Sequence, residues 1–176
     1  MGQLSDEERL AGWVREHGRA VRGFLLAMVR REDVADDLKQ EVFYRAWAAR
    51  GRYKEQGTSL AYLLKIADHL VCDRYRRHQA ERNLDEEGWK RHAPLSPAPE
   101  PPETAACAEQ IRQLLAVLDR LSPIQRRVLL LRYYGQLSFA EIAEAIACPL
   151  NTTLSHCHRA LETLRKLLGG NAAGES

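Results

Sequence analysis

Residues 121–168 read LSPIQRRVLLLRYYGQLSFAEIAEAIACPLNTTLSHCHRALETLRKLL, and this stretch decides the fold. Ser122 followed by Pro123 marks a helix start, because a serine side chain can accept hydrogen bonds from first-turn amides and proline has its φ already set for the first helical position. The helix that begins there is expected to end near Gly135. The stretch therefore opens with one short, clearly delimited helix.

Two further helices follow in the same stretch. Ser138 and Glu141 have the spacing of a capping box, which predicts a short second helix that ends at Pro149. Asn151 is a suitable N-cap for a last helix. Along that helix, apolar residues recur at helical spacing and form a predicted buried stripe of Leu154, Cys157, Leu161, Leu164 and Leu168. Two helices separated by a four-residue break predict a helix-turn-helix.

In a helix-turn-helix, the second helix presents its N-terminal, non-apolar residues to the DNA major groove. Here those residues are Thr152, Ser155, His156 and Arg159, with Asn151 beside them at the expected cap. Short helix-turn-helix segments also occur in all-helical cores that never contact nucleic acid. From this stretch alone, DNA binding and a purely structural role are equally supported.

Charge is unevenly distributed along the 176 residues, although the formal net charge is only +2. Lys and Arg outnumber Asp and Glu by 15 to 12 in residues 1–79 and by 8 to 5 in residues 110–176, whereas acids lead by 7 to 3 in residues 80–109. Two mildly basic blocks therefore flank an acidic middle segment. Overall charge gives no strong indication of nucleic-acid binding.

No apolar run is long enough to cross a bilayer, and residues 1–15 lack the features of a signal peptide, so we expect a cytoplasmic protein without membrane insertion. The four cysteines have no CxxC spacing and are expected to be reduced thiols. Cys148, His156, Cys157 and His158 lie close in sequence, but their spacing fits no zinc pattern. We expect no metal site, no cofactor and no catalytic residue.

Three amphipathic helical patterns occupy residues 6–30, 32–49 and 60–78, and Thr58 and Ser59 are candidate caps for the third. Their apolar sides are Trp13, Val14, Val21, Phe24, Leu25 and Met28, then Val34, Leu38, Val42, Phe43, Ala46 and Trp47, then Leu60, Leu63, Leu64, Ala67, Leu70 and Val71. The outer side of the second helix is highly charged, which ordinary solvation explains. The third helix ends in Arg74, Tyr75, Arg76 and Arg77, which suit either the helix dipole or a phosphate backbone with unstacked bases.

Residues 80–105 contain five of the seven prolines and an acidic patch, which predicts an extended linker without a core of its own. Helical periodicity resumes at Ile111 and leads into the helix-turn-helix. We therefore expect an all-α protein of two small domains. The predicted map is a three-helix domain at 6–79, the linker at 80–105, a four-helix domain with the helix-turn-helix at 106–168, and a disordered tail at 169–176.

Together, the two halves resemble the extracytoplasmic-function class of RNA polymerase sigma factors, the sigma-70 family members that keep only regions 2 and 4. Residues 36–47, DDLKQEVFYRAW, are similar to the region 2 signature of an acidic pair, Leu, Gln-Glu, Phe and Arg-Ala-Trp. LSP at 121–123, LRY at 131–133, LS at 137–138 and EIAE at 141–144 resemble region 4. The resemblance covers most of residues 13–168, with both regions in the family's order.

The resemblance implies that the polar side of the second helix docks on the clamp coiled coil of core RNA polymerase. It also implies that the flap of the polymerase is a second contact of the chain. The implied core-binding residues are Asp36, Asp37, Leu38, Gln40, Glu41 and Arg45. The loop and third helix would capture an unstacked base of the minus-10 element and hold nearby phosphates through Tyr53, Lys54, Glu55, Gln56, Thr58, Ser59, Lys65, Arg74, Arg76 and Arg77. The minus-35 element would meet Asn151, Thr152, Ser155, His156 and Arg159.

The recognition helix departs from the family pattern. Where members commonly have GTVKSRLHRA, this chain has NTTLSHCHRA at 151–160, so Leu154 and His156 replace a Lys and an Arg that are expected to reach DNA. Loss of two cationic contacts lowers DNA affinity and flattens its dependence on salt. We expect either an unusual minus-35 preference or a weaker contact there.

The leading hypothesis is a transcription initiation factor that binds core polymerase and promoter DNA and has no chemistry of its own. Family members are often held inactive by an anti-sigma factor, so one is an expected partner. Two alternatives are a stand-alone dimeric helix-turn-helix regulator and an enzyme built on Cys157 with His156 and His158. The enzyme is the weakest hypothesis, because adjacent residues on a helix point in different directions.

Overall fold

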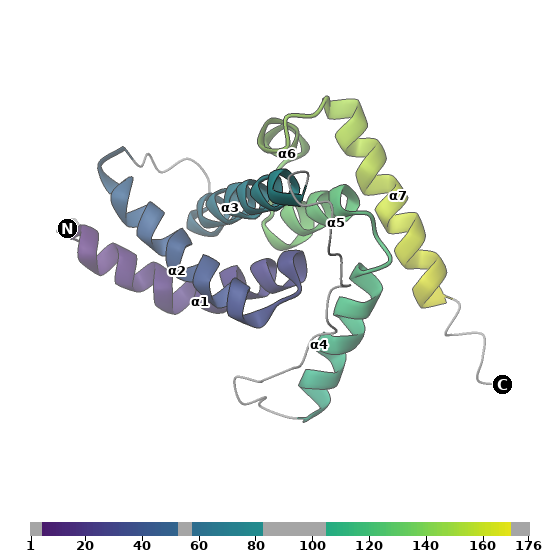
Figure 1. Ribbon diagram of the computed structural model, residues 1–176, viewed down its shortest axis with the longest axis horizontal. Coiled ribbons are helices and arrows are strands. Elements are labelled where there is room, and N and C mark those ends of the chain that lie inside the picture. The colour runs from purple at the N-terminus through teal and green to yellow at the C-terminus, as the bar shows by residue number, and fades with distance from the viewer. Residues whose placement is uncertain (1–4, 53–57, 83–104, 170–176) are drawn as a thin grey trace. The chain divides into compact units, whose positions relative to one another are not determined.

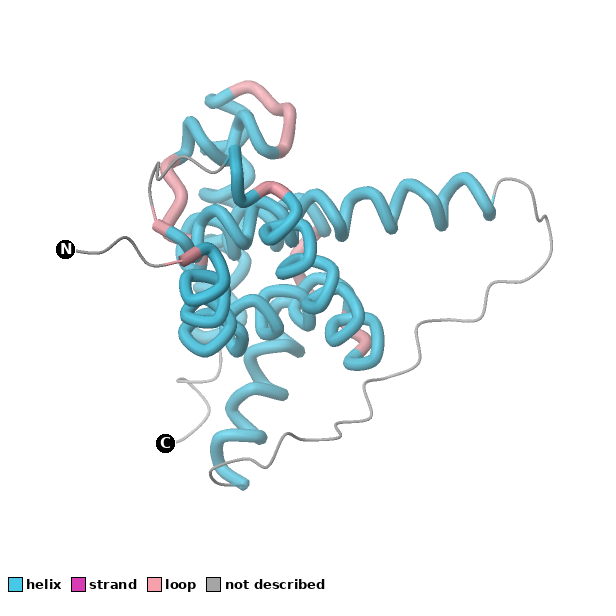
Figure 2. Tube along the Cα trace, turned by 90° about the vertical axis from the view of Figure 1, so that its left-hand side faces the viewer, coloured by secondary structure: helices cyan, strands magenta, loops and turns pink. Residues whose placement is uncertain are grey.

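The computed structural model describes residues 5–52, 58–82 and 105–169. Helices account for every element in these ranges, and none of these residues lies in a strand (Figure 2). The chain divides into two units, and the described residues form three α-helices in the N-terminal unit and four in the C-terminal unit (Figure 1). The predicted all-α fold, with a three-helix and a four-helix domain, is confirmed.

The N-terminal unit packs α1 (Asp6–Val29), α2 (Glu32–Ala48) and α3 (Ser59–Arg82) against one another, with a 3₁₀ turn, η1 (Arg50–Arg52), after α2. α1 begins at a capping box: Glu8 N donates to Ser5 Oγ at 3.2 Å, and Ser5 N donates to Glu8 Oε2 at 2.8 Å. Thr58 caps α3, because its Oγ1 accepts from Ala61 N at 3.2 Å. All three predicted helices are present, and α3 continues past its predicted end near residue 78.

Each helix of this unit buries one apolar face in a shared core. The buried residues include Val21, Phe24, Leu25, Val34, Val42, Phe43, Ala46, Leu63, Leu64, Ala67 and Leu70. Full burial of a Leu or Phe side chain stabilises the fold by roughly 1.5–3 kcal/mol. Val14 was predicted on the apolar side but is 46 % exposed, whereas its neighbour Trp13 is half-buried, with its ring 5.9 Å from that of Tyr62 in α3.

A bidentate ion pair joins α1 to α2 at the rim of this core. Arg22 Nε donates to Asp36 Oδ1 at 2.7 Å, and Arg22 Nη2 donates to Asp36 Oδ2 at 3.2 Å and reaches Glu32 Oε2 at 3.5 Å. The hydrogen bonds from Arg22 lower the pKa of the Asp36 carboxyl below its ordinary value, against a smaller opposing effect of burial. Asp36 is therefore part of the structure that holds the two helices together.

The C-terminal unit contains α4 (Ala105–Leu118), α5 (Pro123–Leu129), a π-helical turn η2 (Leu130–Tyr134), α6 (Phe139–Ala145) and α7 (Leu150–Gly169). Two capping boxes confirm the predicted starts of α5 and α6. Ser122 Oγ accepts from Gln125 N at 3.4 Å, and Ser138 Oγ accepts from Glu141 N at 3.2 Å. In both boxes the side chain at the third position accepts from the cap backbone in return.

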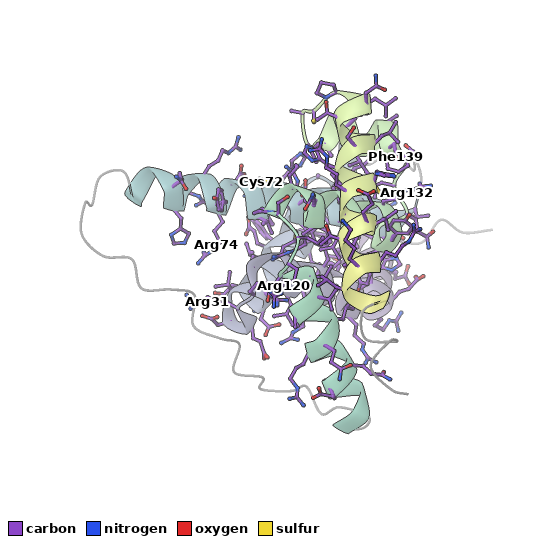
Figure 3. All side chains as sticks on the ribbon, turned by 90° about the vertical axis from the view of Figure 1, so that its right-hand side faces the viewer. Arg31, Cys72, Arg74, Arg120, Arg132 and Phe139 are labelled. Atoms are coloured by element: carbon purple, nitrogen blue, oxygen red, sulfur yellow. The ribbon has the colours of Figure 1, made fainter. Side chains whose placement is uncertain are left out.

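The turn between η2 and α6 is held by Arg132. Its Nη1 donates to Leu137 O at 2.9 Å, and its guanidinium lies over the Phe139 ring, 4.9 Å from the centroid (Figure 3). Both contacts are made by one side chain of η2 with the residues that lead into α6. The first helix of the helix-turn-helix is therefore anchored at its start.

α6 ends earlier than predicted, at Ala145 rather than Pro149. Ala147 adopts a left-handed φ of 51°, Ala147 N donates to Glu144 O at 3.1 Å, and Cys148 N donates to Ala143 O at 2.9 Å. These two hydrogen bonds form a Schellman motif, which ends the helix without proline. Residues 146–149 therefore separate α6 from α7.

The predicted N-cap of α7 is wrong by two residues. Thr153 N donates to Pro149 O at 2.9 Å, so the first intrahelical hydrogen bond of α7 is accepted at Pro149. α7 therefore begins at Leu150, and Asn151 lies within its first turn. The proline has no amide hydrogen that would need a partner at this position, which makes it compatible with a helix start.

The packing side of α7 also differs from the predicted leucine stripe. Thr153, Cys157 and Ala160 are 0 %, 3 % and 0 % exposed, whereas Leu154 and Leu161 are 40 % and 38 % exposed. Thr153 Oγ1 donates to Pro149 O at 3.1 Å, so its buried hydroxyl has a partner. Small side chains allow α7 to approach α5 and α6 closely, and the larger leucines are left at the edge of the contact.

Ala147 is strained, which gives a first prediction. A left-handed conformation costs a residue with a Cβ about 1–2 kcal/mol, and glycine avoids that cost. Ala147→Gly should therefore raise the free energy of unfolding by about 1 kcal/mol, measured by urea unfolding followed by circular dichroism. As a control, Ala145→Gly in the last turn of α6 should lower it by about 0.5–1 kcal/mol. If both substitutions changed the free energy of unfolding by the same amount, Ala147 would not be strained.

Removal of Arg22 should destabilise the N-terminal unit in a pH-dependent way. Because the Asp36 side chain is 43 % exposed, solvent screens the pair, and Arg22→Met should cost only about 1 kcal/mol at pH 7. The folded state lowers the pKa of Asp36, so the stabilisation is full above the ordinary carboxyl pKa and is lost as pH falls through the folded value. The deficit of the variant should shrink below about pH 4.

The control for this measurement is Arg19→Met, which removes an exposed arginine from the same helix. It should change the free energy of unfolding by less than about 0.5 kcal/mol at either pH. A deficit for Arg22→Met that is the same at pH 7 and pH 3 would show that the methionine acts through packing and not through Asp36.

Candidate functional site

The outer face of α2 carries four of the residues predicted to bind core polymerase. Asp37 and Gln40 are exposed and lie about one helical turn apart. Glu41 follows on the same side, and its Oε1 accepts from Arg45 Nε at 2.7 Å. The structure therefore brings these four side chains onto one surface, which has exposed acid, amide and guanidinium groups.

Two members of the same predicted set are placed differently. Asp36 is held by Arg22, and Leu38 is half-buried. Sequence reasoning also missed Tyr44, which is 66 % exposed and lies three and four residues after Glu41 and Gln40, on the same face. Tyrosine is enriched at binding hot spots, because its large ring is rigid and partly polar. An aromatic residue at the spacing of the polar face was the signal that could have identified it.

Of the predicted minus-10 residues, Tyr53, Lys54, Glu55 and Gln56 lie outside the described part of the chain. Thr58 and Ser59 are at the start of α3, and the oxygens of both side chains have partners within the unit. Thr58 Oγ1 accepts from Ala61 N, and Ser59 Oγ lies 2.7 Å from Nε2 of the buried His17. Any DNA contact of these hydroxyls would have to share them with those partners.

The basic end of α3 extends beyond the rest of the bundle, and residues 75–79 are all exposed (Figure 2). Arg74 lies on this projecting stretch (Figure 3). Arg76 forms an ion pair with Asp73, which lowers the pKa of the Asp73 carboxyl, and Arg77 Nε donates to Asp73 O at 3.4 Å. Lys65 lies nine residues before Arg74, about 14 Å along the helix axis, so it does not join the arginine cluster.

A cluster of arginine and tryptophan side chains lies where α1 begins and α2 ends. The Arg50 guanidinium stacks 4.1 Å from the centroid of Trp47, and the Asp6 carboxylate pairs with Arg9 at 2.6 Å and with Arg50 at 3.7 Å. These side chains, with Trp13, line a shallow hollow. The sequence did not reveal this cluster, because its two groups of residues, one at the start of α1 and the other at the end of α2, are some 40 residues apart.

On α7, most of the predicted minus-35 residues share one exposed surface. Thr152, Ser155 and Arg159 are exposed at spacings of three and four residues, and Asn151 is exposed beside them. Ser155 Oγ donates to Asn151 O at 2.9 Å, which leaves the hydroxyl oxygen to face outward as an acceptor. His156 is half-buried and lies at the edge of this surface, four residues after Thr152 and three before Arg159.

Cys157 does not have the properties of a nucleophile. Its side chain is buried, and burial raises the pKa of the thiol, against a smaller opposing effect of Arg132.

His158 Nδ1 lies 3.7 Å from Glu162 Oε2. Within residues 5–52, 58–82 and 105–169, no three His, Cys, Asp or Glu residues are grouped so that they could hold a metal ion. In the same ranges, no helix has the length and apolar character needed to span a membrane.

Comparison with known proteins links each unit to one family. Residues 13–81 match the family model described as Sigma-70 region 2, and residues 111–164 match that described as Sigma-70, region 4. The chain is 33% identical to the RNA polymerase sigma factor CarQ of Myxococcus xanthus over 87% of its own length and 85% of CarQ. It is 30% identical to the ECF RNA polymerase sigma factor SigX of Bacillus subtilis over 81% of its length and 75% of SigX.

Solved structures show the same fold. The sigma factor RpoE, crystallised with the anti-sigma factor NepR from Bartonella quintana, matches 92% of this chain and 97% of its own with a TM-score of 0.72 and 21% identity. CnrH, solved in complex with the cytosolic domain of CnrY, matches 94% of this chain and 91% of its own with a TM-score of 0.63 and 20% identity. The sequence matches and this shared fold agree: the chain belongs to the sigma-70 family, in its extracytoplasmic-function class of RNA polymerase sigma factors.

Proposed function

We propose that this sigma factor binds core RNA polymerase, reads and melts the minus-10 element with its N-terminal unit, and contacts the minus-35 element with α7. Membership of this family supports a role in promoter-specific transcription initiation with RNA polymerase. Sigma factors are regulatory transcription factors rather than enzymes. The observation that carries the finer proposal is the order of the two matched regions, each with an exposed polar face. The stand-alone dimeric regulator is not favoured, because it gives region 2 no role.

The outer face of α2 is proposed as the contact with the clamp coiled coil of the polymerase. Asp37 and Gln40 would make polar contacts, the Glu41–Arg45 pair would flank them, and Tyr44 would supply apolar area. Asp36 would act indirectly, because its carboxylate holds α2 against α1 through Arg22. The flap stays a proposed second contact of the chain with the polymerase.

The minus-10 element is assigned to residues 53–59 and to the basic end of α3. Extrusion of a base from the duplex costs a few kcal/mol, which phosphate contacts and stacking can offset. Arg74, Arg76 and Arg77 would supply the phosphate contacts, and the exposed ring of Tyr75 could stack on an unpaired base.

The proposed domains are residues 6–79 and 106–168, joined by 80–105, and the protein would act in the cytoplasm with the polymerase.

An anti-sigma factor is a proposed regulator of this chain. The solved relative RpoE was crystallised with one, and an inhibitor that covered the outer face of α2 would block the surface needed for core polymerase. The exposed ring of Tyr44 offers such an inhibitor the same apolar area that it offers the polymerase.

The proposed function is tested by run-off transcription with purified core RNA polymerase and fragments of the genome that encodes this chain. Addition of the chain should yield discrete transcripts from a small set of promoters, whereas core enzyme alone should yield none. The chain without polymerase should show little affinity for the same duplexes. Failure to bind core enzyme, or tight binding of a dimer to duplex DNA alone, would contradict the proposal.

Charge reversal on α2 should separate core binding from folding. Asp37→Lys should weaken binding of fluorescently labelled chain to core polymerase at least tenfold, because it replaces an exposed acid in the proposed contact with the opposite charge. The matched control is Glu16→Lys, which reverses an exposed acid on α1. If the two variants bind core polymerase equally well while circular dichroism shows both folded, the outer face of α2 is not the contact.

A further inference from the structure

Two exposed apolar side chains flank the polar surface at the start of α7. Leu150 and Leu154 are 47 % and 40 % exposed, and their spacing of four residues places them on the same strip of the helix. Asn151 and Ser155, which follow them directly, are exposed as well. The strip therefore borders the surface proposed to meet DNA.

Leu154 is not required to complete the core of the C-terminal unit. That contact is made by Thr153, Cys157 and Ala160, all less than 4 % exposed. A single exposed leucine on a protein surface is ordinary. The position of this leucine is informative, because it lies within the first two turns of the helix, where a helix-turn-helix contacts base edges.

The chemistry of the major groove leaves one partner for such a side chain. Base edges there present hydrogen-bond donors and acceptors, and the apolar group that protrudes into the groove is the 5-methyl group of thymine. A leucine placed against a donor or acceptor would remove it from water without a replacement hydrogen bond, which costs free energy. A leucine placed against a thymine methyl removes two apolar surfaces from water at once, which is favourable.

We infer that Leu154, supported by Leu150, determines specificity by packing against the methyl group of a thymine in the upstream promoter element. The inference rests on the proposed function, because α7 has to enter the major groove. Leu154 stands where the family pattern has a cation, so this chain exchanges a contact that recognises charge for one that recognises a base.

The test uses the reconstituted holoenzyme. Promoters randomised in the upstream element are selected for binding, and each thymine of the selected sequence is then replaced by deoxyuridine, which differs only by the methyl group. Replacement at one position should weaken binding about fourfold, the equivalent of roughly 0.8 kcal/mol for a buried methyl-sized group. With Leu154→Ala, the ratio of the binding affinities for promoters with thymine and with uracil at that position should fall below about 1.5.

Leu161→Ala is the matched control. Leu161 is 38 % exposed on the same side of α7, but it lies seven residues, or about 10 Å, farther from the N-terminus of the helix. This variant should keep the fourfold ratio. A second variant, Leu154→Lys, should lose the ratio and steepen the dependence of log K on log salt by about one, because it adds a phosphate contact.

The outcomes distinguish the inference from the function on which it rests. A holoenzyme that selects no upstream sequence overturns both the minus-35 contact and the role of Leu154. If an upstream sequence is selected but uracil binds as well as thymine at every position, only the role of Leu154 is overturned. The same conclusion holds if Leu154→Ala keeps the fourfold ratio or if Leu161→Ala also loses it.

Discussion

The close contact of α7 with α5 and α6 determines which side chains of α7 face outward. Thr153 and Ala160 are completely buried, so a larger side chain at either position would push the helix away from its neighbours. Because successive residues on a helix point about 100° apart, this buried edge fixes the rest of the surface. Thr152 and Ser155 face outward as a consequence, and Leu154 lies at the border of this surface, three residues after Asn151, rather than in the core.

The same geometric rule divides an acidic pair in α2. Asp36 and Asp37 are chemically identical neighbours, yet Asp36 turns towards α1 and binds Arg22, whereas Asp37 is exposed. The first carboxylate stabilises the domain, and the second is available to another molecule. A protein surface that binds a partner needs both kinds of residue, because an exposed contact can be positioned accurately only if the helix that carries it is held in place.

Sequence patterns predicted the helices well where the relevant interactions are local. The capping boxes at Ser122 and Ser138 involve residues three apart, so they could be read directly and were confirmed. The buried side of α7 was wrong in part, because hydrophobic periodicity favours leucine over threonine and alanine, whereas close packing favours small side chains. The stack of Arg50 on Trp47 is local, but the link of Arg50 to Asp6 joins residues far apart in sequence, so it depends on the tertiary fold and has no local signature. The predicted polymerase and minus-10 contacts came from family resemblance and the DNA contacts of α7 from the helix-turn-helix pattern, and all of them stay predictions.

The composition of the α7 surface suggests why DNA binding by α7 would depend on the polymerase. Arg159, Arg165 and Lys166 are exposed on α7, but the family's two additional cations are replaced by Leu154 and His156. Fewer phosphate contacts lower the affinity for any duplex, specific or not. In the proposed function both units are attached to one polymerase at a promoter, and the upstream contact would then be intramolecular, with an effective DNA concentration in about the millimolar range. Under those conditions a weak contact is sufficient for occupancy, and small base-specific differences, such as one methyl group, can decide between promoters.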